Sequence, residues 1–215
     1  MLKGYTHIEI LLDKSGSMTS IRGATIDGFN RFISKQREAA DKCTVSLSVF
    51  SQVLTPSLFT FNDLDSIPLL TPETYVPTGL TALYDSLCYR IDTLGKQLSN
   101  LPESLRPENV VFLILTDGYE NASKIYLAAD VKQRIEEQIN KYNWNFTYIG
   151  ANQEAILVAR EIGIFSQMTM DFAATAQGTL NSFDIIGTKM KDYRTTGNVA
   201  DIYYKDEDRV KAMAE

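Results

Sequence analysis

Three oxygen-bearing side chains occupy alternate positions near the start of the chain. Asp13, Ser15 and Ser17 follow directly after an apolar run at residues 7–12. Gly16, between the two serines, allows the backbone to turn tightly. Carboxylate and hydroxyl oxygens are the ligands that hard cations such as Mg²⁺ prefer. The pattern therefore predicts a divalent-cation site; the alternative is that these residues only shape a turn and cap a helix.

Two further oxygen-bearing residues stand at comparable places later in the chain. Thr81 follows the turn-rich residues 77–80, and Asp117 comes soon after the very apolar run at residues 110–115. In open α/β sheets, ligand sites are built at the carboxyl ends of the strands. Thr81 and Asp117 are therefore candidates to complete the site begun by Asp13, although Thr81 alone is better explained as a helix cap than as a ligand.

Strand-like and helix-like patterns alternate along the whole chain. Runs typical of strands occur at residues 7–12, 43–50, 53–61, 110–115, 145–150 and 167–172. Apolar residues at helical spacing indicate helices that begin near residue 19 and at Thr81, and others around residues 131–139, 153–162 and 180–190. This alternation predicts an α/β domain with a doubly wound, mostly parallel central sheet and helices on both faces.

One strand is expected to run against the others. Only two residues separate the strand-like runs at 43–50 and 53–61, whereas a parallel crossover needs a dozen or more. Pro56 suits an edge strand, where a missing backbone donor is tolerated. We therefore expect one antiparallel edge strand. Glu9 fits this fold poorly, because a charged residue is unfavourable in a central strand. We expect its side chain to reach solvent, since it lies away from the carboxyl end of the strand.

Length and composition exclude several classes of protein. The chain has 215 residues and a net charge of −6, which argues against general binding to nucleic acid. No apolar run reaches membrane-span length, and the first strand begins too early for a signal peptide. Cys43 and Cys88 are too few for a disulfide framework, and we expect two buried thiols. These features predict a cytoplasmic protein, a monomer by default, without a nucleic-acid or membrane partner.

The order of these motifs resembles that of the von Willebrand factor A (VWA) domain. The metal-ion-dependent adhesion site (MIDAS) of that family has the pattern Asp-x-Ser-x-Ser, then a distant Thr and a distant Asp. Residues 13–17, Thr81 and Asp117 match it in order, and the flanking residues 79–83 and 115–118 are similar too. The resemblance extends to about residue 195, so we expect a VWA domain at 1–195 and a charged tail or short helix at 196–215. Residues 148–153 are similar to stand-alone bacterial and phage VWA proteins.

The resemblance implies a role for each matching residue. Ser15 and Ser17 would bind Mg²⁺, or Mn²⁺, directly. Asp13 and Asp117 would act largely through water, and Thr81 directly or through water. Neutral hydroxyls leave much of the cation's charge uncompensated, so an open position attracts a carboxylate from a protein partner.

Three functions follow from different classes of protein. The first is a non-enzymatic module that binds a partner Asp or Glu through the metal. The second is a Mg²⁺-dependent hydrolase or phosphoryl-transfer enzyme, because strand-end carboxylates also serve that chemistry. A phosphate-binding loop and a Gly-x-Ser-x-Gly motif are absent from the sequence, and His7 is its only histidine. The third is a structural subunit with a stabilising metal.

A few residues near the motifs receive secondary interpretations. Tyr75, Tyr84 and Tyr119 are candidates to rim the metal face. Asp85 is interpreted as a surface or capping residue and Glu120 as a solvated loop residue, and His7 is expected at a strand entrance without a chemical role.

Overall fold

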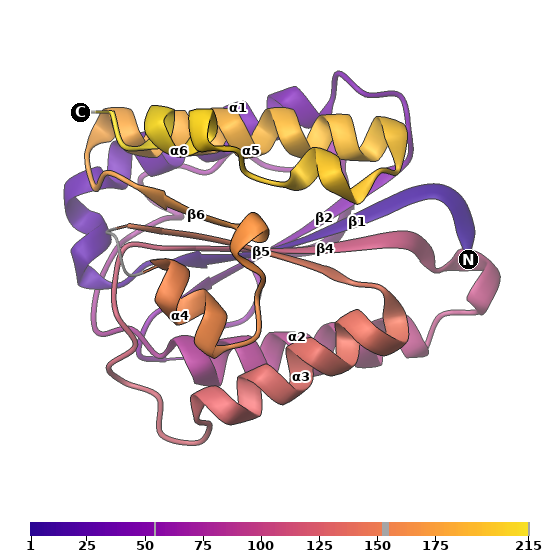
Figure 1. Cartoon of the computed structure of the whole chain (residues 1–215), viewed down its shortest axis with the longest axis horizontal. Helices are drawn as coiled ribbons and strands as arrows, with labels where there is room; N and C mark the ends of the chain where they lie inside the picture. The colour runs from indigo at the N-terminus through magenta and orange to yellow at the C-terminus, as the bar shows by residue number, and fades with distance from the viewer. Residues whose placement is uncertain (54, 152–154, 215) are drawn as a thin grey trace.

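The structure, a computed structural model, describes residues 1–53, 55–151 and 155–214. These residues form a six-stranded sheet in the order β3-β2-β1-β4-β5-β6 (Figure 1). β2 and β3 pair antiparallel, and the other neighbouring strands pair parallel. The strands are β1 (Leu2–Asp13), β2 (Cys43–Phe50), β3 (Phe59–Asp63), β4 (Pro107–Thr116), β5 (Asn145–Ala151) and β6 (Thr169–Phe172). The predicted fold class, with its antiparallel edge strand, is confirmed.

Helices cover both faces of this sheet (Figure 1). On one face lie α1 (Arg22–Gln36), α5 (Ala176–Thr196) and α6 (Asp206–Ala212), and on the other lie α2 (Leu83–Ser99), α3 (Ala128–Tyr142) and α4 (Ala155–Glu161). Short 3₁₀ helices span Gly16–Ile21, Leu64–Ser66, Glu103–Leu105, Ser166–Met168 and Val199–Ile202. None of the helices described combines the length and apolar character that crossing a membrane requires.

The centre of the sheet determines where a ligand site can form. β1 lies between β2 and β4, and the chain passes from β1 to β2 on one side and returns through α2 to β4 on the other. The strand order therefore reverses between β1 and β4, and in open α/β sheets ligands bind at such a point, at the carboxyl ends of the strands. Leu12 pairs with Leu115, so Asp13 and Thr116 end the two strands side by side. Both strands are almost completely buried, which gives this edge a rigid base.

Two predicted boundaries are wrong. β3 begins at Phe59 and not at residue 53, so Pro56 lies in the connection before the strand; Leu54, within the predicted strand, is outside the described residues. α2 begins at Leu83, two residues after Thr81, and the Thr81 side chain does not cap it. Residues 152–154, which include Gln153 at the predicted start of α4, are also outside the described residues.

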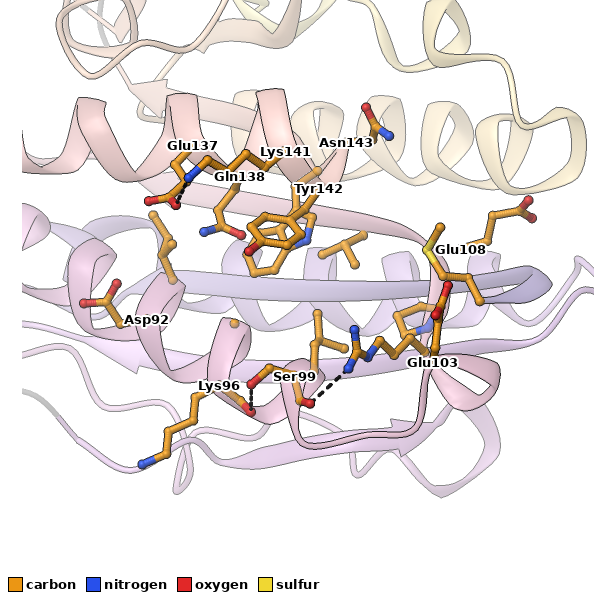
Figure 2. Close-up of a pocket in the computed structure, with 18 residues that line it drawn as sticks. Asp92, Lys96, Ser99, Glu103, Glu108, Glu137, Gln138, Lys141, Tyr142 and Asn143 are labelled. Atoms are coloured by element: carbon orange, nitrogen blue, oxygen red, sulfur yellow. Dashed lines mark hydrogen bonds and ion pairs between the residues drawn. The ribbon is translucent and has the colours of Figure 1, made fainter.

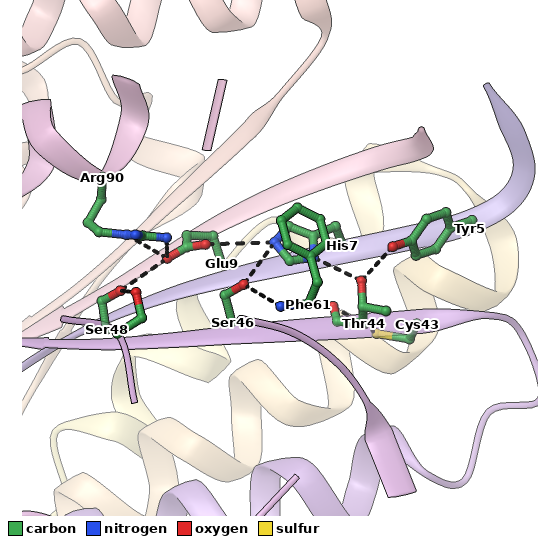
Figure 3. Close-up of polar contacts among 10 residues, drawn as sticks. Tyr5, His7, Glu9, Cys43, Thr44, Ser46, Ser48, Phe61 and Arg90 are labelled. Atoms are coloured by element: carbon green, nitrogen blue, oxygen red, sulfur yellow. Dashed lines mark hydrogen bonds and ion pairs between the residues drawn. The ribbon is translucent and has the colours of Figure 1, made fainter. Parts of the chain in front are cut away.

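Glu9 does not reach solvent as expected. Its side chain is completely buried, and Arg90 of α2 donates two hydrogen bonds to Glu9 Oε1, from Nε at 3.0 Å and Nη2 at 2.8 Å (Figure 3). The charge of Glu9 in a central strand is therefore compensated from a helix 81 residues away in sequence. His7 is also buried, with its ring stacked on Phe61 at 4.0 Å between centroids.

The residues after α5 pack on the sheet's β6 edge. Arg209 of α6 donates to the carbonyls of Thr169, at 2.6 Å, and Ser166, at 2.7 Å. The backbone N–H of Ala173 donates to the carbonyl of Ala212 at 3.1 Å. The charged C-terminal segment thus includes a short helix that is docked on the domain.

Candidate metal centre

Asp13 occupies the last position of β1 and is completely buried. Its Oδ1 accepts the backbone N–H of Ser15 at 2.6 Å, and its Oδ2 accepts the Thr116 hydroxyl at 2.6 Å. Burial raises the pKa of Asp13 to about 6, although the hydrogen bonds from Thr116 and Ser15 act in the opposite direction and Asp117 adds to the increase. The carboxylate is therefore held in a fixed orientation without a neutralising cation among the described side chains.

Ser15, Ser17 and Asp117 form a chain of short polar contacts beside Asp13. The hydroxyl oxygens of Ser15 and Ser17 lie 3.0 Å apart, and the Ser17 hydroxyl donates to Asp117 Oδ1 at 2.6 Å. Burial raises the pKa of Asp117, and the hydrogen bond from Ser17 partly offsets this. A hydroxyl that donates its proton to a carboxylate directs its lone pairs elsewhere, where they can bind a cation.

Thr81 completes the cluster from the connection before α2. A Cβ atom built on Gly118 would lie 2.9 Å from Thr81 Oγ1, 3.3 Å from Ser17 Oγ and 3.6 Å from Ser15 Oγ. Three hydroxyl oxygens thus face one small volume beside Gly118, and glycine at that position leaves the volume open. Thr81 and Ser15 are both 2% exposed, so their hydroxyls are held in place by packing.

The loop after β4 holds Thr81 at this point. Asn121 forms a reciprocal pair with Thr81, because its Oδ1 accepts the Thr81 N–H at 2.9 Å and its own N–H donates to the Thr81 carbonyl at 3.0 Å. Asp85 accepts three backbone N–H groups of residues 124–126 at 2.8–3.1 Å. Glu120 accepts the N–H groups of Tyr84, Ala122 and Ser123 at 2.7–2.9 Å. The loop is therefore attached to the start of α2 by these three side chains and by Ser123, whose hydroxyl accepts the Asp85 N–H at 3.0 Å.

Three secondary interpretations are wrong at this site. Asp85 is not a surface or capping residue, because it is buried and binds the backbone of the loop before α3. Glu120 is not a solvated loop residue, because its carboxylate organises the loop and also accepts the Ser123 hydroxyl at 2.7 Å. Tyr75 is completely buried and does not rim the metal face; its hydroxyl donates to the Asp13 carbonyl at 2.5 Å. The sequence offered one signal for these contacts, the density of Asp, Asn, Glu and Ser in residues 117–123, which is typical of structured polar loops.

A divalent cation fits this set of donors. All five candidate side chains offer oxygen, two as carboxylates and three as hydroxyls, and they converge from β1, from the start of α2 and from the end of β4. No group of three or more His, Cys, Asp or Glu side chains suited to a metal occurs among the described residues. Neutral hydroxyls therefore provide most of the donors here. Hard cations accept such oxygen ligands, whereas thiophilic metals prefer sulfur.

No family model and no curated protein matches the chain. Solved structures do match its fold. A von Willebrand factor type A protein from Catenulispora acidiphila matches with a TM-score of 0.57 and 14% identity, over 88% of this chain and 42% of that chain. Manganese-loaded TRAP protein from Plasmodium vivax matches with a TM-score of 0.56 and 16% identity, over 81% of this chain and 70% of that chain.

A third match is proximal thread matrix protein 1 from the mussel byssus, solved with a zinc-occupied MIDAS motif. Its TM-score is 0.54 at 16% identity, over 90% of this chain and 46% of that chain. This chain thus spans less than half the length of the Catenulispora and mussel proteins. At these identities the likeness shows a shared fold, and the argument for function has to come from the site.

Proposed function

We propose that this chain, whose fold is that of von Willebrand factor A domains, is a binding module that uses a divalent metal to hold a carboxylate of a protein partner. Asp13, Ser15, Ser17, Thr81 and Asp117 would hold Mg²⁺ or Mn²⁺. The metal would supply an open coordination position and a positive charge for an Asp or Glu side chain of the partner. The module would act as a monomer and without catalysis.

One observation carries this proposal, the convergence of three hydroxyls on the open volume beside Gly118. A turn or a helix cap would use each hydroxyl separately, whereas here Thr81, Ser17 and Ser15 face the same point. The buried carboxylate of Asp13 beside them lacks a cationic partner among the described residues. A buried charge is unfavourable unless it is paired or coordinates a metal.

The hydrogen bonds support a different part for each side chain in this proposal. Both carboxylate oxygens of Asp13 already accept hydrogen bonds, so Asp13 orients the Ser15 loop and contributes charge, and would reach the metal through water. Asp117 accepts the proton of Ser17, which leaves the lone pairs of Ser17 for direct binding. Thr81 and Ser15 offer the other two hydroxyls. The zinc-occupied mussel structure and the manganese-loaded Plasmodium structure support a cation at this edge of the fold only as likeness.

The position of the single histidine argues against the enzyme alternative. His7 lies on β1 six residues before Asp13, roughly 20 Å along the strand, and is covered by Phe61. It is therefore too far away to serve as a general base at the metal centre. The third function, a structural subunit with a stabilising metal, can be distinguished by experiment. Removal of the metal would then lower the stability of the protein without changing its affinity for a carboxylate ligand.

Calorimetric titration of the protein with Mn²⁺ and Mg²⁺ tests the proposal. We expect saturable binding to the wild type and a loss of at least about tenfold in affinity in Asp13→Ala and in Asp117→Ala, since each removes a charge from the site. Asp184→Asn is the matched control. It changes a carboxylate of α5 that pairs with Lys35 near the C-terminal end of α1, and it should bind the metal as the wild type does.

A second titration, with acetate or glutamate added to the metal-loaded protein, tests the carboxylate. The ligand should bind only with metal present, and each should tighten the binding of the other. Metal binding that both alanine variants retain would contradict the site. Metal binding without any effect of the carboxylate would favour the stabilising role instead.

A further inference from the structure

A second cavity lies at the end of the sheet opposite to the metal centre. It opens between the C-terminal ends of α2 and α3, beside the first residues of β4, and has a volume of about 590 Å³ (Figure 2). Its apolar part is formed by Ile91, Leu98, Val110 and Trp144, each no more than 8% exposed. Tyr142, at the mouth, is 59% exposed. This size and lining are typical of sites for small organic molecules.

Gly95 keeps one wall of the cavity open. It lies within α2, where glycine is unfavourable relative to alanine, and it lines the cavity. A Cβ atom at this position would meet no other atom within 4 Å. By contrast, a Cβ at Gly28 of α1 would lie 2.3 Å from the Phe183 ring, so packing explains that glycine. No contact within the protein requires glycine at position 95, and its effect is to leave space between the helices.

The charges around the cavity are unevenly neutralised. Arg106 donates to the carbonyls of Leu101 and Ser99 at 2.9 and 3.0 Å, so its positive charge lies at the C-terminal end of α2, where the helix dipole partly offsets it. Lys141 pairs with Glu137 at 2.7 Å. The Glu103 carboxylate, in contrast, forms no hydrogen bond or ion pair with any residue that the structure describes.

Further features make the mouth of the cavity attractive to a cation. Among the described residues, the Glu108 carboxylate bonds only to the uncharged N–H of Gly4, at 2.7 Å, and is not paired with a cation. Lys96 is exposed, and its amino group extends away from the aromatic rings (Figure 2). α3 also ends here, and a helix C-terminus carries partial negative charge. The unpaired negative groups therefore lie beside an apolar and aromatic floor.

We propose that this cavity is a second binding site, for a small aromatic amine. The ring would occupy the space between Tyr142 and Leu98 that Gly95 leaves open, and the ammonium group would lie near Glu103 and Glu108. Aromatic side chains favour a cation close to their faces, which adds to the attraction of the carboxylates. The site is separate from the metal centre, and binding requires no metal.

Trp144 makes the proposal directly testable, because it is the only tryptophan of the chain and lines the cavity. Its fluorescence would be followed during titration, in EDTA, with three probes that share one ring. These are phenethylamine, phenethyl alcohol and phenylacetate, which are cationic, neutral and anionic. We expect a saturable change with phenethylamine, weaker binding of the alcohol by several-fold, and no binding of phenylacetate.

Variants locate the site. Gly95→Leu should fold at least as well as the wild type, because leucine is the better helix former, and should weaken amine binding at least tenfold by filling the cavity. Gly23→Leu is the matched control, since a Cβ at Gly23 of α1 also meets no atom within 4 Å. Replacing both carboxylates, Glu103→Gln with Glu108→Gln, should bring the affinity for the amine down to that for the alcohol.

Several results would overturn the proposal. Equal binding of the three probes would refute the choice of a cation. Binding that Gly95→Leu leaves unchanged would refute the cavity as the site. An unchanged spectrum up to about 10 mM phenethylamine would refute the site for this class of ligand, since useful affinities for so small a molecule lie below that concentration. None of these results depends on the metal centre.

Discussion

Two buried carboxylates on the same strand have opposite surroundings. Glu9 and Asp13 are four residues apart on β1, so they point to the same face of the sheet, and both are completely buried. Arg90 donates two hydrogen bonds to Glu9, and Ser48 adds a long one at 3.4 Å (Figure 3). The Asp13 carboxylate receives hydroxyls and a backbone N–H, and none of the described cationic side chains pairs with it.

This difference in surroundings gives the two carboxylates different roles. The charge of Glu9 is structural, whereas the charge of Asp13 is available for binding. The ion pair with Arg90 compensates the charge of Glu9 and fastens α2 to β1. Because Thr81 stands just before α2 and Asp13 ends β1, this ion pair also fixes the two halves of the metal centre relative to each other. At Asp13 the chain leaves a charge uncompensated, and the raised pKa is the sign of the resulting instability. A bound cation would remove that instability.

The largest effect is expected when the structural pair is broken. Arg90→Met leaves Glu9 buried without a cation and should lower the free energy of unfolding by about 3–5 kcal/mol. Urea denaturation measures the loss. The double variant with Glu9→Gln removes both charges and should recover part of it. A loss below about 1 kcal/mol in the single variant would show that Glu9 finds another partner or solvent.

Replacing Asp13 is expected to change the free energy of unfolding in the opposite direction. In metal-free protein at about pH 7, Asp13→Asn should raise the free energy of unfolding by roughly 2–3 kcal/mol, because it removes a buried charge. Its amide can keep both contacts, accepting from the Ser15 N–H and donating to the Thr116 hydroxyl. The same variant should bind Mn²⁺ more weakly than the wild type. A destabilised variant would contradict the view that the charge is uncompensated.

The pH dependence of stability should identify Asp13 as the cause. Its pKa is about 6 in the folded protein, above the unfolded value, so between about pH 4 and pH 6 the folded state binds more protons. The contribution of Asp13 to stability is therefore highest below the unfolded pKa and is lost as pH rises through the folded pKa. The stability difference between Asp13→Asn and wild type, followed by urea denaturation in EDTA, should shrink towards zero at about pH 4. A constant difference would assign it to packing.

A surface carboxylate gives the smallest effect. Asp184 accepts from Lys35 and Lys211, each at 2.8 Å, and its side chain is 51% exposed. The hydrogen bonds from Lys211 and Lys35 lower its pKa, so its stabilising contribution is present above the unfolded pKa and is lost as pH falls through the folded pKa. Asp184→Asn should cost less than about 1 kcal/mol, and less still in high salt. A larger or salt-independent loss by urea denaturation would show a packing role.

Local patterns in the sequence were sufficient for the fold class and for part of the site. The alternation of strand and helix patterns identified the mostly parallel sheet. A strand buried on both faces and a helix buried on one face each impose their own pattern of apolar residues along the chain. Asp13, Ser15 and Ser17 are close together because they are neighbours in sequence, and Asp117 follows the most apolar strand. The motif order also led to the VWA resemblance, which the fold likeness supports.

Tertiary structure alone decided how those residues are held and which charges are neutralised. Glu9 and Arg90 are 81 residues apart, and Ser17 and Asp117 are 100 apart. The hydrogen bonds of Asn121 with Thr81 and of Tyr75 with Asp13 also join residues that are distant in sequence. Nothing in the residue types alone indicates these partners. Such pairs have no periodic signature, since each depends on which elements the sheet order places side by side. The sequence therefore determined which donors the chain offers, and packing determined that Glu9 is neutralised while Asp13 is not.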